Sequence, residues 1–323
     1  MKNLLHIFLV LTTICSCEVD VTDEFRNQQN LFVVSGQVVA GQSSRINLSR
    51  TITLTELDTL LFLNEAQLEI RKNDTLFVLD PEGDGFYRNE SLIPLPGDVL
   101  SLRCSGEELP PVSVVTTVPD YPQISDLGWE VDSFYNFTLE LTIEDPASTA
   151  DYYSFFISGW NLEVIYRYDG DSEPTIDTSN VYGAYHLRIL DPVLEYTGGP
   201  RQFYQYNPSE PYGEYFHFSD RMINGTNHTL TVTDNLFHLY NDSIPEIYVH
   251  LIKRDFHYYN FLESYIHYDP FPEQDFIQPV QVYSNIEGGY GLLTAEAGVI
   301  DTIDLSEWYL DPDFLDHLGS SAK

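Results

Sequence analysis

The feature that most constrains this chain is an alternation of apolar and polar side chains that recurs along much of its length. Residues 66–71 alternate without a break, and residues 137–144 form the cleanest amphipathic strand in the sequence. A two-residue period places every second side chain on one face, as a half-buried β-strand requires. Clusters of Gly, Pro and Asp at residues 80–85 and 94–98 separate such runs with turns. The sequence therefore predicts an all-β protein.

Further strands are expected at residues 31–40, 46–48, 100–104, 152–160, 186–190, 229–232 and 246–252. One helix is expected near residues 255–267, because Asp255 can cap its N-terminus and four apolar residues follow with helical spacing. These four residues are Tyr258, Leu262, Tyr265 and Ile266. Residues 167–184 and 195–214 show no such pattern and are predicted to be long loops.

The domain organisation follows from these elements and from a Pro-rich stretch at residues 109–122. We expect two β-sandwich-like domains, with one short helix in the second, on an N-terminal lipid tether. The predicted segments are a signal peptide (1–16), a lipidated acidic tether (17–30), an N-terminal β-sandwich (31–119), a C-terminal β-rich domain (120–312) and a tail (313–323).

The N-terminus has the features of a secretion signal. Lys2 precedes an apolar run from Leu4 to Ile14, which is shorter than the roughly 20 residues of a transmembrane helix. The block Ile14-Cys15-Ser16-Cys17 resembles the bacterial lipobox, in which two small residues precede the lipidated cysteine. Cys17 is therefore predicted to carry the lipid that anchors the mature protein to a membrane.

Composition narrows the classes of partner. The chain has 15 Lys and Arg against 50 Asp and Glu, a formal net charge of −35. Such a charge argues against nucleic acid as a ligand, because phosphate binding needs a basic surface. Cys104 alternates with two leucines on one predicted strand face and is interpreted as a buried core residue.

No motif predicts catalysis, a metal or a cofactor. A nucleophile elbow, a phosphate-binding Gly loop and zinc-ligand spacing are all missing from the sequence. Residues 80–85 resemble the start of a calcium loop, but Ser91 stands where that loop needs a bidentate Glu, so a β-hairpin turn is favoured. His250, His257 and His267 are expected to pack or to face solvent.

Several short motifs, taken together and in order, resemble a family of bacterial lipoproteins. They are Val33-Val34-Ser35-Gly36, Ile46-Asn47-Leu48-Ser49-Arg50, residues 64–70, Gly85-Phe86-Tyr87, Phe218-Ser219-Asp220, Asn224-Gly225-Thr226 and residues 283–291. The chain resembles the Bacteroidota lipoproteins called domain of unknown function 4249. The resemblance implies an accessory lipoprotein, encoded beside TonB-dependent outer-membrane transporters, with a transthyretin- or immunoglobulin-like first domain.

Anchor and resemblance together predict a lipoprotein of the outer membrane, facing the cell surface. Its expected role is that of a non-enzymatic binding or accessory subunit of a TonB-dependent transporter system. Two alternatives remain: a structural or assembly factor for an outer-membrane complex that binds no cargo, and a hydrolase of surface glycans or peptides.

Two sets of residues are candidates for contact or modification. Tyr204, Tyr206 and Tyr212 lie in a predicted loop rich in Tyr and Pro, and we expect them to contact a partner or cargo while contributing little to folding. Whether other aromatic residues, including Trp160 and Tyr215-Phe216, bind or pack is left open by the sequence. Four residues lie in Asp-Ser/Thr-apolar triplets typical of O-glycosylation in exported Bacteroidota proteins: Thr59, Thr75, Ser243 and Thr302.

The lipid anchor leads to the first testable prediction. Cys17→Ala should abolish acyl labelling and leave the precursor unprocessed or soluble, because the substitution removes the acceptor thiol. Metabolic labelling with a fatty-acid analogue measures this, and Cys15→Ala is the matched control that should be labelled normally. Labelling that persisted in Cys17→Ala would refute the assignment.

Overall fold

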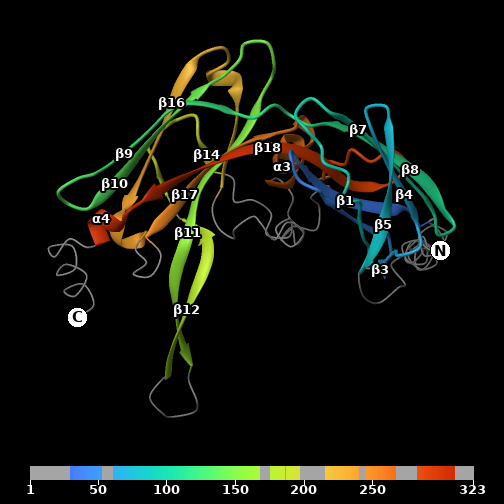
Figure 1. The fold of residues 1–323 in the computed structure, drawn as a ribbon, viewed down its shortest axis with the longest axis horizontal. Coiled ribbons are helices and arrows are strands. Elements are labelled where there is room, and N and C mark those ends of the chain that lie inside the picture. Colours follow the sequence, from blue (N-terminus) through green and yellow to red (C-terminus); the bar gives the residue numbers. More distant parts are fainter. Residues whose placement is uncertain are drawn as a thin grey trace, which may run out of the picture.

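The computed structural model describes residues 30–52, 61–167, 175–185, 187–196, 215–239, 245–266 and 282–309. These residues form a mostly β structure, as the alternation predicted. One mixed sheet contains 14 strands, and a second sheet contains 4 strands (Figure 1).

The strands of the first half are β1 (Phe32–Val39), β2 (Arg45–Arg50), β3 (Leu61–Phe62), β4 (Gln67–Lys72), β5 (Thr75–Gly83), β6 (Phe86–Arg88), β7 (Val99–Gly106) and β8 (Leu109–Thr117). Those of the second half are β9 (Gln123–Val131), β10 (Asn136–Glu144), β11 (Tyr152–Arg167), β12 (Thr175–Ala184), β13 (Arg188–Ile189), β14 (Glu195–Tyr196), β15 (Phe216–Ser219), β16 (Asn227–Asn235), β17 (Glu246–Arg254) and β18 (Tyr290–Asp304).

The helical elements are short and few in the described ranges. They are the 3₁₀ turns η2 (Asp220–Met222) and η3 (Leu236–His238) and the helices α3 (Phe256–Ile266) and α4 (Ser306–Tyr309). None of the helices in the described part of the chain is long and apolar enough to cross a membrane.

Strand β18, the last described strand of the sequence, lies beside β1, the first. It pairs with β1 in parallel, from Val33↔Tyr290 to Val39↔Glu296, and with β17 antiparallel on its other side. The large sheet therefore runs β14-β15-β11-β17-β18-β1-β2-β6-β5-β4-β7-β8, while the small sheet runs β13-β16-β10-β9. In Figure 1 the red β18 extends from beside the orange β17 to the blue β1.

Two hydrophobic cores lie on the same side of β18. Leu293, Ala295 and Ala297 belong to the core that β1, β2, β6 and β18 form with β4, β7 and β8. Further along the strand, Ile303 belongs to the core between β11, β15, β17 and the small sheet. Because these residues all have odd numbers, a single face of β18 serves both cores. Its other face carries Leu292, which packs against Tyr258, Phe261 and Leu262 of α3.

The fold contains the predicted helix, but a strand lies where part of a loop was predicted. The helix is confirmed, as are the buried positions of Tyr258 and Leu262 in its apolar stripe. The prediction of a loop at residues 167–184 is wrong in part, because Thr175–Ala184 form β12 and pair with β11 over ten positions. Thr, Ile, Val and Tyr favour a strand there without strict alternation. The domain boundary near residue 120 and the lipid tether stay predictions.

Gly291 illustrates how closely β18 approaches β1. Its φ is +111°, and a Cβ built on it would lie 1.9 Å from the carbonyl oxygen of Val34. A backbone atom cannot move aside as a side chain could, so no rotamer change relieves this contact. The Gly-rich block that resembled the lipoprotein family thus lies where β18 and β1 join the two halves of the large sheet.

We expect Gly291→Ala to lower the free energy of unfolding by about 3 kcal/mol or more, through steric overlap added to backbone strain. Gly97→Ala is the matched control, since Gly97 also has a positive φ, +81°, but nothing within 4 Å of its added Cβ. It should cost only about 1 kcal/mol, the strain of the left-handed backbone. Urea unfolding compares the two variants, and equal losses would show that close strand approach is unimportant.

Candidate functional site

Asp255 connects three elements where the two cores meet. Its Oδ1 accepts a hydrogen bond from the Tyr258 N–H at 2.8 Å, which confirms the predicted cap of α3. Its Oδ2 accepts one from the Thr116 hydroxyl of β8 at 2.5 Å and one from the Ala295 N–H of β18 at 2.9 Å. Burial raises the pKa of this carboxyl, and the hydrogen bonds that it accepts act in the opposite direction. One side chain therefore bonds the N-terminus of α3 to both β8 and β18.

A cleft of about 530 Å³ lies beside Asp255. Residues 115–120 of β8 and its continuation line one wall, and residues 149–152 and 253–257 line the other. Phe256 is 54% exposed, and its ring centroid lies 5.9 Å from that of Tyr152. Aromatic surface combined with charged groups is typical of sites that hold a ligand by ring contact and orient it by polar contacts.

Three buried aspartates, Asp145, Asp151 and Asp220, lie next to this cleft, with carboxylate oxygens within 4.8 Å of one another. Lys253 Nζ donates to Asp151 Oδ2 at 2.7 Å, and the Tyr153 hydroxyl donates to Asp145 Oδ1 at 2.7 Å. Asp220 Oδ2 accepts the Asp151 N–H at 2.9 Å, and burial raises the pKa of Asp220. The spacing of the oxygens could hold a cation, and the Lys253 ammonium already supplies positive charge there.

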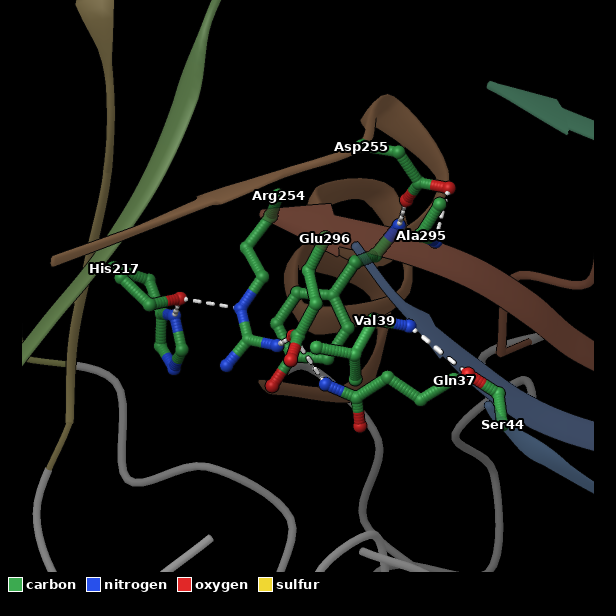
Figure 2. Close-up of polar contacts among 10 residues, drawn as sticks. Gln37, Val39, Ser44, His217, Arg254, Asp255, Ala295 and Glu296 are labelled. Atoms are coloured by element: carbon green, nitrogen blue, oxygen red, sulfur yellow. Dashed lines mark hydrogen bonds and ion pairs between the residues drawn. The ribbon is translucent and has the colours of Figure 1, made fainter. Parts of the chain in front are cut away.

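A buried polar network crosses the sheet around Arg254 (Figure 2). The Arg254 guanidinium forms an ion pair with Glu296 of β18, and Glu296 accepts a second hydrogen bond from Gln37 of β1. On its other side, Arg254 Nε donates to Ser154 Oγ at 2.9 Å, and Ser154 is in turn 2.7 Å from His217 Nδ1. Figure 2 shows Arg254 between His217 and Glu296, while Asp255 turns toward Ala295. The network thus connects β15, β11, β17, β18 and β1.

The two buried histidines on this face are neutral at pH 7. Burial, followed by the neighbouring Arg254 charge, lowers the pKa of His217 to about 3. Burial lowers the pKa of His250 to about 4, and its Nε2 lies 2.7 Å from Ser158 Oγ. Ser154 and Ser158 are themselves fully buried. Both serine–histidine pairs are therefore packed inside the protein, although His250 also lines a second cavity.

A second cavity, of about 400 Å³, lies on the same side of the sheet. Its wall is largely aliphatic and aromatic, and His250 and Glu296 also line it. Ile300 in this wall is 64% exposed. The arrangement offers an apolar surface next to the polar network, smaller than the cleft at Asp255.

Comparison with known proteins places the chain in a family. The model of the family described as domain of unknown function (DUF4249) matches residues 16–297. The chain belongs to the DUF4249 family. No curated protein sequence matches it.

The structure also tests several residue interpretations for this DUF4249 protein. Cys104 is confirmed as a buried core residue, and burial raises the pKa of its thiol to about 12. The predicted hairpin is confirmed, but its turn is limited to Asp84-Gly85, because residues 80–83 belong to β5 and pair with β6. Tyr215 and Phe216 are fully buried, so they pack instead of binding at the surface.

The structure does not test the predicted roles of the other site residues. Thr75 at the start of β5 and Thr302 in β18 are exposed, and their glycosylation stays a prediction. The remaining predicted residues lie outside the described part of the chain: Cys17, Thr59, Tyr204, Tyr206, Tyr212, Ser243 and His267.

Sequence reasoning did not identify the residues that the fold of this DUF4249 protein brings together. Arg254, Glu296 and Gln37 come from three strands that are far apart in the sequence. A weak signal was present in β11, where Ser154 and Ser158 alternate with Phe155 and Ile157 in an otherwise apolar run. Small polar residues on one face of a fully buried strand indicate polar partners on neighbouring strands.

The lowered histidine pKa values predict a specific pH dependence of stability. The unfolded chain binds protons at these histidines below a pKa of about 6.5, whereas the folded protein does not until about pH 4 or 3. Stability is therefore present above pH 6.5 and is lost as the pH falls, by about 2 kcal/mol per histidine between pH 7 and 5.

Urea unfolding at pH 7 and pH 5 should show this loss in the wild type. His217→Asn and His250→Gln retain an amide group that can form a hydrogen bond with the serine. Each variant should remove about half of the loss of stability that the two histidines cause between pH 7 and pH 5. An unchanged pH dependence in both variants would show that these histidines are not the cause.

Proposed function

We propose that the protein is a lipid-anchored outer-membrane lipoprotein that faces the cell surface. It acts there as a non-enzymatic binding or accessory subunit of a TonB-dependent transporter system. The anchor is supported by the lipobox-like block ending at Cys17, and the family match begins at residue 16, directly before it. The transporter association rests on the resemblance to lipoproteins of this family.

The observation that carries a binding role is the cleft at Asp255. Its walls come from both halves of the chain, and the hydrogen bond from Thr116 to Asp255 joins those halves. A preformed cleft loses little conformational entropy when it takes up a ligand. Lys253 and Arg254 of the cleft wall form ion pairs with Asp151 and Glu296 of the protein itself. We therefore assign these two basic residues a structural role in the wall.

An assembly role without cargo is favoured by a different feature. Strands β11 and β12 form a two-stranded arm that projects far from the body of the molecule (Figure 1). A projecting arm contributes little to the two cores, and it suits contact with another protein. The arm and the cleft are compatible, since a transporter subunit can hold a partner at one place and cargo at another.

A capture experiment from detergent-solubilised outer membranes distinguishes these roles. A transporter recovered with bound cargo supports the binding role, a barrel recovered without cargo supports assembly, and recovery of neither overturns the proposed function.

Phe256→Ala should reduce cargo capture at least fivefold while leaving the barrel bound, because it removes the exposed ring of the cleft wall. Phe134→Ala is the matched control, since Phe134 is also an exposed Phe, at 78%, and is not part of the cleft lining. Thermal unfolding checks that both variants stay folded. Equal capture by the two variants would exclude the cleft as the cargo site.

A further inference from the structure

The arm formed by β11 and β12 has an edge at β12 that the rest of the described structure leaves unpaired. Over ten positions, from Ser158↔Ala184 to Arg167↔Thr175, the two strands pair without a register shift. Among the described residues, β12 pairs with β11 alone. Its outer edge therefore presents a row of backbone N–H and C=O groups that a further strand could bond.

Apart from the outer edge of β11 in the same arm, which β17 pairs only as far as Gly159, the other sheet edges in the described structure are mostly short or obstructed. Strands β3, β13 and β14 are two residues long. Strand β8 contains Pro110 and Pro111, and its Ser113 exchanges both backbone hydrogen bonds with Glu287. Strand β9 has a register shift against β10, and Asp126 and Glu130 lie along it. These are the usual means by which proteins prevent edge pairing.

Strand β12 has few of these protections. Its sequence, TIDTSNVYGA, contains no Pro and no Lys, and its one charged residue is Asp177. Thr, Ile, Val and Tyr are the residues most compatible with strand pairing. The difference between this edge and the protected ones indicates a surface kept open for pairing.

The root of the arm is held firmly. The Tyr182 hydroxyl lies 2.7 Å from Ser158 Oγ, which is itself bonded to His250. The Tyr182 ring centroid lies 5.4 Å from that of Trp160 and 6.1 Å from that of Tyr248. A strand fixed at its root presents its edge in one orientation, which lowers the entropy lost on pairing.

We propose that the edge of β12 binds an extended, basic strand of another polypeptide by β-strand addition. Charge selects this occupant over a second copy of the chain. Residues 160–182 contain one basic residue, Arg167, and five acidic residues: Glu163, Asp169, Asp171, Glu173 and Asp177. The whole chain carries a net charge of −35. Two such arms repel each other, whereas a basic strand is attracted.

This inference rests on the proposed function and names the kind of contact that the partner makes. It can be tested without a membrane, using a ten-residue peptide that alternates valine with lysine as the probe. Hydrogen–deuterium exchange of the full mature chain should show protection of amides in β12 when the peptide binds. A peptide N-methylated at alternate residues, which cannot complete the edge hydrogen bonds, should bind at least tenfold more weakly. A valine–glutamate peptide should also bind more weakly, because of its charge.

Two truncations of the arm provide the matched variants. In the first, an Asn-Gly turn replaces residues 162–180 and joins Asn161 to Val181, which are paired in the register. In the second, the same turn replaces residues 168–174 and joins Arg167 to Thr175, leaving all of β12 in place. Both turns close cross-strand pairs of the same type, because they lie an even number of residues apart.

The first truncation should weaken peptide binding at least tenfold. The second keeps the whole edge but removes Asp169, Asp171 and Glu173, so it should weaken binding of the lysine peptide by less than about threefold. The inference is overturned if neither truncation affects binding, if N-methylation has no effect, or if the peptide does not bind the wild type. A concentration-dependent dimer that only the first truncation abolishes would also overturn it, in favour of a second copy. Failure here leaves the membrane capture result standing, because that experiment does not depend on which surface makes the contact.

Discussion

The parallel pairing of β1 with β18 brings the first and last described strands of the chain side by side, and much of the structure depends on it. Through this pairing, Leu293 and Ala295 complete the first core, while Ile303 at the other end of β18 belongs to the second. Neither core is complete before residues 290–304, which form β18, have been synthesised. Pairing across so many intervening residues has a large loop-closure cost, so folding of this protein should be slow compared with that of helical proteins.

The same strand also organises the buried polar groups. Its backbone at Ala295 donates to Asp255, and its next residue, Glu296, pairs with Arg254. Burying an ion pair costs desolvation free energy that the mutual attraction of the charges offsets only when the geometry is good. Hydrogen bonds from Gln37 to Glu296 and from Arg254 to Ser154 supply that geometry. We interpret the network as fixing the register of β1, β17 and β18, since a slip of one residue would separate these groups.

What could be predicted from the sequence was local. Alternation located β4 and β10 to within a residue, and the Asp255 cap followed from its position before an apolar stripe. Contacts between segments that are far apart in the sequence could not be predicted, because they leave no local pattern. The pairing of β18 with β1 leaves no periodic trace, and the prediction for residues 175–184 failed because strict alternation is absent in β12. The Asp255 cleft was also missed, since its walls come from segments more than a hundred residues apart.

Strand β11 connects the two proposed binding surfaces, the cleft at Asp255 and the edge of β12. Its first residue, Tyr152, lines the cleft, and its last, Arg167, lies at the far end of the arm. At a rise of about 3.3 Å per residue, a continuous strand of 16 residues separates these points by roughly 50 Å. A strand added to β12 would therefore leave the cleft open, and a ligand in the cleft would leave the edge free. Because the same strand forms both, a partner bound to the arm would hold the cleft at a defined distance and orientation. That arrangement supports the proposed role, in which one bound molecule is held at a fixed position relative to another.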